Sequence, residues 1–207
     1  MKITKITLTN FRAFKKATGD GFWDAAIDKS FELMTNMQNN FAPNTGLIPD
    51  FIVGLPGNPY PSPGGRIESS NEGFFAWNGC RILWRLGSDY VTSGDTRSRD
   101  VTSKIMDFLN KTTGGNGALI AMGYKLDGTS LSTPTLDWTS ASFVGPAMAG
   151  ALVDSRFQPF LNNLWALDTA HPATGYYDYE LQLLSMIVVS GNWWNPLKNS
   201  DSNSHPT

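Results

Sequence analysis

The segment Ile67–Tyr90, IESSNEGFFAWNGCRILWRLGSDY, combines the end of a loop with the start of a helix. Glu68 and Glu72 lie in its first part, which continues a stretch rich in glycine, proline and serine. Its second part starts with aromatic residues and has two arginines at i and i+4, Arg81 and Arg85, which would share one helix face. Because loops that a rigid helix positions often carry reactive side chains, this segment is the candidate functional region.

Outside this segment, apolar residues recur mainly at helical spacing. The spacing predicts helices at about 20–37, 74–92, 97–112, 140–153, 156–168 and 177–190, paired along the sequence, with Asp20 as N-cap of the first. Several are apolar around much of their circumference and should pack on two sides. Long loops are expected over 41–73 and 113–138. No strong β pattern follows residue 20, so the predicted class is all-α, built from helical hairpins.

The two ends of the chain differ from the middle. Residues 2–9 alternate in the manner of a strand and should be extended or loosely attached. The opening MKITKITLTNFRAFKK resembles the first strand of RecF- or SMC-like ATPases, but no GxxxxGK[ST] motif follows. We therefore interpret 1–19 as a leader of separate origin, 20–197 as the helical domain and 198–207 as a disordered polar tail.

Composition narrows the choice of ligand. Apolar residues make up 41% and charged residues 16%, with a net charge of −2, which gives no electrostatic case for nucleic acid or an anionic membrane. One cysteine and two histidines exclude an intramolecular disulfide and make a metal centre unexpected, and no cofactor is predicted. No apolar run is long enough for a membrane span, and MKITKITLTN lacks the apolar core of a secretory signal. A neutral or weakly charged ligand suits this chain best.

Several motifs, in order, carry a resemblance: Gly46–Asp50 (GLIPD), Glu68, Asn78–Arg81 (NGCR), Trp84-Arg85, Asp89-Tyr90 and Ser190–Trp194 (SGNWW). Together they resemble the second half of family 8 glycoside hydrolases, from about Trp23 to Pro196. The resemblance implies an (α/α)6 barrel of six inner and six outer helices, of which this chain would form an incomplete barrel, about half. It also implies endo-hydrolysis, with inversion, of a β-1,4-linked polysaccharide such as chitosan, β-glucan, cellulose or xylan.

Inversion needs two carboxyl groups, a protonated acid for the leaving oxygen and an ionised base for the attacking water. In one branch of the family the base is a glutamate just before the N-C-R helix, and an asparagine replaces a catalytic aspartate on that helix. Glu68 and Asn78 fit this pattern, so Glu68 is the expected general base and Glu72 the alternative base. Both could instead be solvated loop carboxylates.

Other residues have two interpretations each. Arg81 would hold the base or the water, or form a salt bridge to Asp89 or to another helix carboxylate. Arg85 is expected to be structural. Asp50 would line the cleft or cap a turn. The candidate substrate-binding residues are Asp50, Asn78, Trp84, Tyr124, Tyr176 and Tyr177, with Trp23, Trp77 and Trp138 as further sugar platforms; each aromatic could equally be core.

The chain departs from the family in one respect. The family's catalytic acid and its A-T/S-D-G/A-D motif lie in the N-terminal half, and neither is recognisable here, so the proton donor is expected to be missing. Two alternatives to an active hydrolase follow, a non-catalytic carbohydrate-binding module and a self-associating structural fragment. A half barrel would expose an apolar patch that a homo-oligomer could cover.

Overall fold

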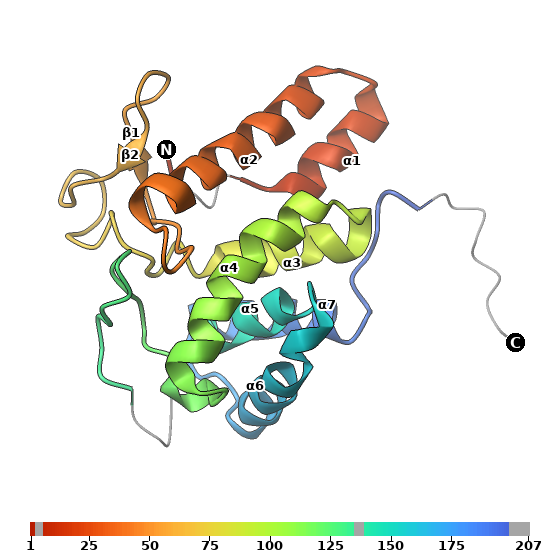
Figure 1. Ribbon diagram of the computed structural model, residues 1–207. Helices are drawn as coiled ribbons and strands as arrows, with labels where there is room; N and C mark the ends of the chain where they lie inside the picture. Colours follow the sequence, from red (N-terminus) through yellow and green to blue (C-terminus); the bar gives the residue numbers. More distant parts are fainter. Residues whose placement is uncertain (3–5, 135–138, 199–207) are drawn as a thin grey trace, which may run out of the picture.

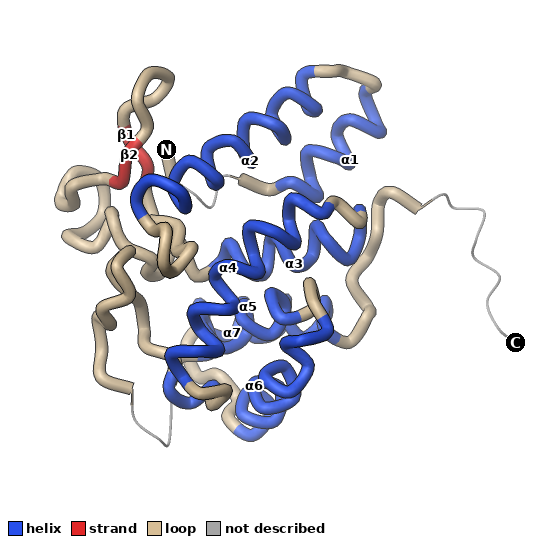
Figure 2. Tube along the Cα trace, in the orientation of Figure 1, coloured by secondary structure: helices blue, strands red, loops and turns tan. Residues whose placement is uncertain are grey.

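The computed structural model describes residues 1–2, 6–134 and 139–198. Over these residues it is helical, with two short strands (Figures 1 and 2). The helices are α1 (Leu8–Thr18), α2 (Phe22–Phe41), α3 (Arg81–Ser93), α4 (Thr96–Thr113), α5 (Ala141–Ala151), α6 (Gln158–Ala170) and α7 (Tyr176–Val189), with 3-10 turns η2 (Gly117–Leu119) and η3 (Ser155–Phe157). The strands β1 (Ile52–Val53) and β2 (Tyr60–Pro61) form an antiparallel hairpin within the long loop after α2.

Consecutive helices pair as hairpins, α1 with α2, α3 with α4 and α5 with α6. The odd-numbered helices are neighbours in one row, because α1 contacts α3, α3 contacts α5 and α5 contacts α7. The even-numbered helices pack behind this row, each on the helix before it (Figure 1). This alternation confirms the all-α prediction and is the arrangement of inner and outer helices in an α/α barrel.

Helix α5 is the centre of the core. Every residue of α5 is buried, and α5 contacts α3, α4, α6 and α7. Burial of Phe143 and Met148 contributes about 1.5–3 kcal/mol each. The approach of α3 to α5 depends on Gly87, where an added Cβ would lie 2.2 Å from the carbonyl oxygen of Ala149. Small residues therefore fix the spacing of the row.

The prediction that residues 2–9 are extended is wrong for residues 8 and 9, whereas Lys2 forms an isolated antiparallel bridge with Phe51. Leu8 begins a helix and is buried, so residues 8 and 9 are not part of a strand. Helix α1 is held firmly: Arg12 binds Asp89 and Asp95, each at 2.7 Å, from α1 to the end of α3. These long-range contacts outweigh the local alternation of residues 2–9. Residues 3–5 and 199–207 lie outside the described residues, and the separate origin of 1–19 stays a prediction.

The second predicted helix begins later than expected, at Arg81 instead of residue 74. The backbone N–H groups of Ala76, Asn78 and Gly79 all donate to the carboxylate of Asp50, which folds this stretch into turns. In the described part of the chain, no helix is both long enough and apolar enough to cross a membrane.

Candidate active site

Glu72 closes the loop that precedes α3. Its side chain is fully buried, and its carboxylate accepts hydrogen bonds from the hydroxyl of Ser62 (2.8 Å) and from the N–H groups of Ile67 (2.6 Å), Glu68 (2.6 Å) and Ser69 (3.1 Å). Burial alone would raise the pKa of Glu72, but these donors outweigh it and lower the pKa to about 2. The structure therefore places the alternative base where its carboxylate is enclosed by the protein's own donors.

Asp50 organises the turn that leads into α3. Its oxygens accept from the N–H groups of Ala76 (2.8 Å), Asn78 (3.1 Å) and Gly79 (2.5 Å). Burial raises the pKa of Asp50 to about 6, against the opposing effect of these donors. Gly79 must be glycine, since a Cβ there would lie 3.0 Å from Asp50 Oδ1 and 2.9 Å from the Ile48 carbonyl. Asp50 is only 3% exposed, so it caps this turn and does not line an open cleft.

Glu68 differs from both of these carboxylates because 44% of its side chain is exposed. One oxygen accepts from Lys2 Nζ at 2.6 Å, and the other accepts from Asn78 Nδ2 at 3.0 Å. Lys2 and Asn78, with a smaller contribution from the charge of Arg81, lower the pKa of Glu68 below the usual value of 4.5. Glu68 is therefore ionised at neutral pH and open to solvent, as a general base must be.

Asn78 and Arg81 support Glu68 as a connected pair. Arg81 Nη2 donates to Asn78 Oδ1 at 2.5 Å, which leaves the Asn78 amide N–H groups to face Glu68 and Asp50. The expected salt bridge from Arg81 to Asp89 is absent among the described residues, because Asp89 binds Arg12 and Ser98. The Arg81 guanidinium lies instead 5.4 Å from the ring centroid of Tyr177.

An aromatic wall of Trp77, Phe143 and Tyr177 stands beside these polar residues. The Trp77 ring is 6.1 Å from that of Tyr177 and 5.2 Å from that of Phe143, and the Tyr177 hydroxyl donates to the Trp77 carbonyl. Trp77 is 44% exposed and Tyr176, next to the wall, is 80% exposed. Phe143 is only 2% exposed, so Trp77 is the exposed ring of this wall. An exposed aromatic ring near an ionised carboxylate suits a pyranose ring.

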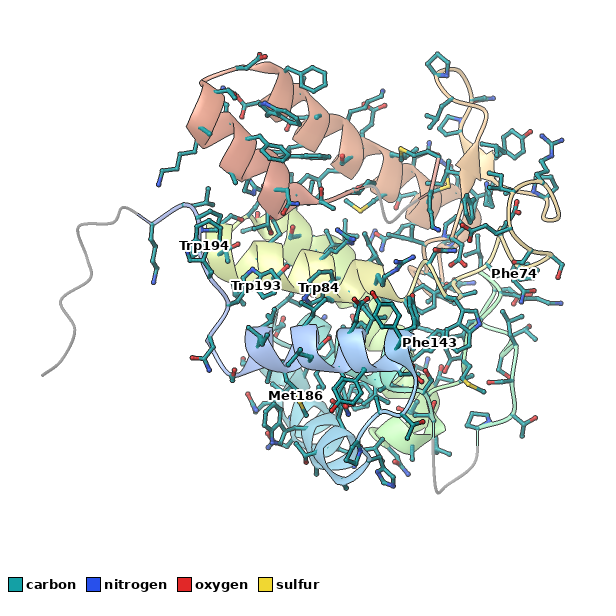
Figure 3. All side chains as sticks on the ribbon, turned by 180° about the vertical axis from the view of Figure 1, so that it is seen from behind. Phe74, Trp84, Phe143, Met186, Trp193 and Trp194 are labelled. Atoms are coloured by element: carbon teal, nitrogen blue, oxygen red, sulfur yellow. The ribbon has the colours of Figure 1, made fainter. Side chains whose placement is uncertain are left out.

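The other predicted sugar platforms lie elsewhere. Tyr124 is 1% exposed, with its hydroxyl accepting from the Ala121 N–H, so it belongs to the core. Trp84 packs edge-on against Trp193, with ring centroids 5.6 Å apart, on the face seen in Figure 3. Trp23 packs among Phe11, Phe14 and Phe22 at the α1–α2 hairpin. Trp138 lies outside the described residues.

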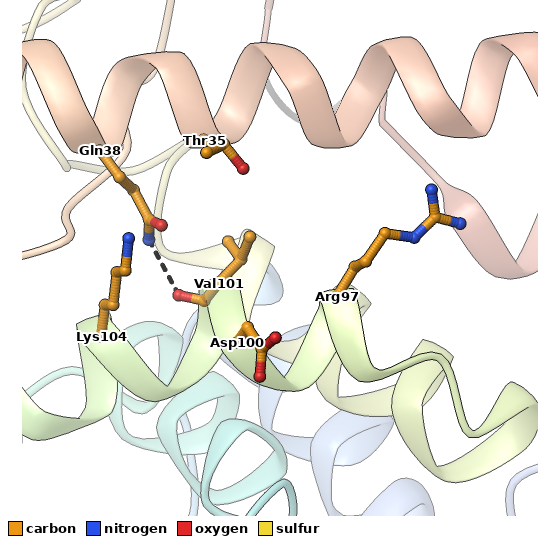
Figure 4. A pocket seen from close by; sticks show the side chains of 6 residues that line it. All are labelled: Thr35, Gln38, Arg97, Asp100, Val101 and Lys104. Carbon is orange, nitrogen blue, oxygen red and sulfur yellow. Dashed lines mark hydrogen bonds between the residues drawn. The ribbon is translucent and has the colours of Figure 1, made fainter.

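A hollow lies between α2 and α4. It is lined mainly by polar and charged residues, among them Gln38, Arg97 and Lys104 (Figure 4). Gln38 donates to the carbonyls of Val101 (2.9 Å) and Gly46 (2.8 Å), which ties the two outer helices together. Its lining contains no aromatic residue and does not include Glu68. The described residues also contain no group of three potential metal ligands.

Comparisons with known proteins relate the chain to one enzyme family. No family model matches. The chain is 35% identical over 188 residues to a β-glucanase of Niallia circulans, covering 90% of this chain and 45% of the relative. The structure of a β-1,3-1,4-glucanase from Paenibacillus sp. X4 matches with a TM-score of 0.89 and 32% identity, over 94% of this chain and 50% of that one. A GH8 xylobiose complex from Teredinibacter turnerae matches with a TM-score of 0.75 and 20% identity, over 95% and 48%.

The chain is homologous to one half of a family 8 glycoside hydrolase. The comparisons confirm the resemblance, and the match to half of each barrel agrees with the expected C-terminal half. The chain spans about half the length of the curated relatives it matches. For the Teredinibacter turnerae structure, the low identity supports the shared fold alone.

Within this family 8 half barrel, sequence reasoning missed Lys2 as the partner of Glu68. Lys2 lies in the segment 1–19 that the sequence predicts to be a separate leader, so the sequence gives no reason to pair it with Glu68. The wall residue Phe143 was also missed, because its position within an apolar helix gave no signal beyond core.

Proposed function

We propose that this chain supplies the base side of an inverting, endo-acting β-glucan hydrolase, with Glu68 as the general base. The observation that carries the proposal is the state of Glu68, which is ionised, half exposed and next to an aromatic wall. In the reaction, a water bound to Glu68 loses a proton to its carboxylate as the water oxygen attacks the anomeric carbon. Asn78 and Arg81 hold the Glu68 carboxylate in place for that transfer.

The aromatic wall positions the sugar for this attack. Trp77 is adjacent to Asn78 in sequence, and the Tyr177 hydroxyl donates to the Trp77 carbonyl. A pyranose ring that stacks on Trp77 is proposed to lie next to the water of Glu68. The leaving oxygen needs a proton donor roughly 6.5–9.5 Å from the base, on the opposite side of the ring. Asp50 and Glu72 are enclosed by backbone donors, so the donor is proposed to come from the half of a family 8 enzyme that this chain does not match.

The charges around Glu68 favour a neutral glucan over chitosan. Lys2 and Arg81 both lie close enough to affect the pKa of Glu68. A glucosaminium ring in this place would bring a third cation beside them, which costs free energy. The β-glucanase names of the relatives point the same way. We therefore propose a β-1,4-linked or mixed-linkage β-glucan as substrate.

Reducing-sugar release tests this proposal on three polymers, mixed-linkage β-glucan, carboxymethylcellulose and chitosan. The complete enzyme, made by joining this chain to the unmatched half of the Paenibacillus enzyme, is expected to release sugar from the glucans and little from chitosan. The Glu68→Gln variant serves as the matched control. Equal release by wild type and variant would refute Glu68 as the base.

A second candidate function is glycan binding without cleavage by this chain alone, favoured by the burial of Asp50 and Glu72, neither of which is free to act as an exposed acid. A half cleft buries less of a sugar, so we expect millimolar affinity for oligosaccharides, about −4 kcal/mol. Titration with cello-oligosaccharides, followed by tryptophan fluorescence, measures it. Binding without release supports this function, and no change at tens of millimolar ligand contradicts it.

A further inference from the structure

Three of the residues that line one small cavity each have a buried polar atom without a hydrogen-bond partner. The atoms are Thr9 Oγ1, Trp84 Nε1 and Arg85 Nε. The cavity measures about 30 Å³ and lies between the start of α1, the middle of α3 and Trp193. Two of the three atoms are obligate donors, so the cavity is equipped to bind an acceptor.

Arg85 also lacks a counter-ion among the described residues. Its guanidinium has an aromatic contact, 5.2 Å from the Trp84 ring, but no carboxylate contact. Asp89, one turn further along α3, would be its natural partner, but Asp89 is turned toward Arg12 (2.7 Å) and Ser98 (2.7 Å). Burial and the nearby charge of Arg81 lower the pKa of Arg85 to about 10.

Arg85 is partly buried, with its Nε atom enclosed and without a hydrogen-bond partner. An anion would supply both hydrogen-bond acceptors and the opposite charge, whereas an amide or a water supplies the acceptors alone. One carboxylate would meet both needs, since its two oxygens can accept from the Arg85 and Trp84 N–H groups and from the Thr9 hydroxyl. The ligand chemistry indicated by the site is therefore a single carboxylate.

Trp193 lines the cavity and belongs to the segment that follows α7. Large apolar side chains are exposed on α7 and in the segment after it, with Trp194 77%, Tyr179 57% and Leu183 52% exposed. Trp84, Trp193, Trp194 and Met186 are seen together on this side of the molecule (Figure 3). An exposed apolar surface of this kind marks a protein contact. The matched relatives are about twice as long as the chain, so they contain further polypeptide that can cover it.

We propose that the cavity formed by Thr9, Trp84 and Arg85 receives the carboxylate of an acidic side chain from the half of a family 8 enzyme that this chain does not match. Arg85 is the counter-ion, and Trp84 and Thr9 fix the orientation of the carboxylate. This inference rests on the half-barrel relationship and not on the proposed hydrolysis, so its test uses binding and stability instead of activity.

The test co-expresses this chain with the unmatched half of the Paenibacillus β-1,3-1,4-glucanase and measures the dissociation constant of the complex. Arg85→Met keeps the volume but removes the charge, and it should weaken the complex at least tenfold. Arg99→Met is the matched control, because Arg99 is exposed and already paired with Asp100; it should change the affinity less than twofold. A double-mutant cycle between Arg85→Met and each acidic residue of the added half should reveal one residue with at least tenfold coupling.

The chain alone gives a second readout. Without its carboxylate, Arg85 is a partly buried charge without a counter-ion among the described residues, so Arg85→Met should leave the Tm of the isolated chain unchanged or raise it by about 2 °C while it weakens the complex. Circular dichroism checks that the variant folds. If Arg85→Met instead lowers the Tm of the isolated chain, the substitution destabilises the fold and the proposal is contradicted.

Titration with formate distinguishes the proposed side-chain carboxylate from the other possible occupants of the cavity, a free anion or water. The Trp84 indole N–H resonance, assigned with Trp84→Phe, should move when the complex forms. If it moves with free formate but not with the added half, the site binds a free anion and the proposal is overturned. If it moves with neither, or if Arg85→Met binds the added half within twofold of wild type, the cavity holds water only and the proposal is also overturned. Self-association that the added half does not suppress would equally overturn it.

Discussion

Glu68 and Glu72 lie four residues apart in one loop, yet the structure gives them opposite surroundings. Glu72 accepts from four backbone N–H groups and a serine hydroxyl, whereas Glu68 accepts from Lys2 and Asn78 and is otherwise open to solvent. Both have a lowered pKa, so charge state does not distinguish them. What distinguishes them is free space beside the oxygens. A carboxylate whose lone pairs are already used by the protein stabilises a loop, and one with unused lone pairs can take a proton from water.

The largest expected effect is on catalysis. In the complete enzyme, Glu68→Gln should lower kcat on mixed-linkage β-glucan by about 10²–10⁴-fold, because the amide cannot deprotonate water. Since Glu68 is exposed, the Tm should stay within about 2 °C of wild type. Steady-state kinetics and calorimetry on the same preparation check both. A large fall in Tm would mean that Glu68, like Glu72, is structural.

Glu72→Gln should act on the loop itself. The neutral amide cannot accept from several N–H groups at once as the carboxylate does, so amide exchange at Ile67, Glu68 and Ser69 should accelerate by roughly tenfold or more. Activity should fall as a consequence, because Glu68 loses its fixed position. Hydrogen-exchange mass spectrometry measures the first effect. Unchanged exchange together with lost activity would make Glu72 the base.

The same glutamate predicts a pH dependence of loop order. Because the pKa of Glu72 is lowered from 4.5 to about 2, its stabilisation is complete above pH 4.5 and is lost as the pH falls toward 2. Loop exchange, corrected for intrinsic rates, should therefore rise through that window in the wild type. In Glu72→Gln it should be high and independent of pH there.

A smaller effect is expected from Lys2. Lys2 makes the largest contribution to the lowered pKa of Glu68, so Lys2→Met should raise that pKa and move the acidic limb of kcat/KM to higher pH. Lys29→Met is the control, because Lys29 pairs with Glu32 on the exposed side of α2. Superimposable pH profiles for wild type and Lys2→Met would show that the contact is not maintained when substrate binds.

The smallest effect concerns the aromatic wall. Trp77→Ala should raise the dissociation constant for cello-oligosaccharides by about 3–10-fold, equivalent to ~0.5–1.5 kcal/mol for one aromatic contact. Tyr176→Ala, next to the wall and not part of it, should have less effect. Fluorescence of the remaining tryptophans follows both titrations. A larger increase in the dissociation constant for Tyr176→Ala than for Trp77→Ala would place the sugar-binding site closer to the start of α7.

The helices were largely predictable from sequence because their signals are local. Helix α4 was expected at 97–112 and spans Thr96–Thr113, where Asp95 caps its start by accepting from the Arg97 N–H and Gly114 ends it with a left-handed conformation. The start of α3 was not predictable, since it depends on Asp50, 26 residues from Ala76 in sequence. The different surroundings of Glu68 and Glu72 also come from the fold of the whole loop. Both residues appear in the sequence as acidic residues among glycines and serines.

The contact between Gly87 and Ala149 has a consequence for how such an enzyme can change. A side chain at position 87 would force α3 away from α5, so the spacing of the inner helices tolerates little variation. The loop that carries Glu68 and the residues at the start of α7 lie outside this constraint. Substrate preference can therefore drift through loop substitutions while the scaffold beneath them stays the same. Directed evolution toward another glycan should randomise positions 66–69 and 176 and leave positions 87 and 149 untouched.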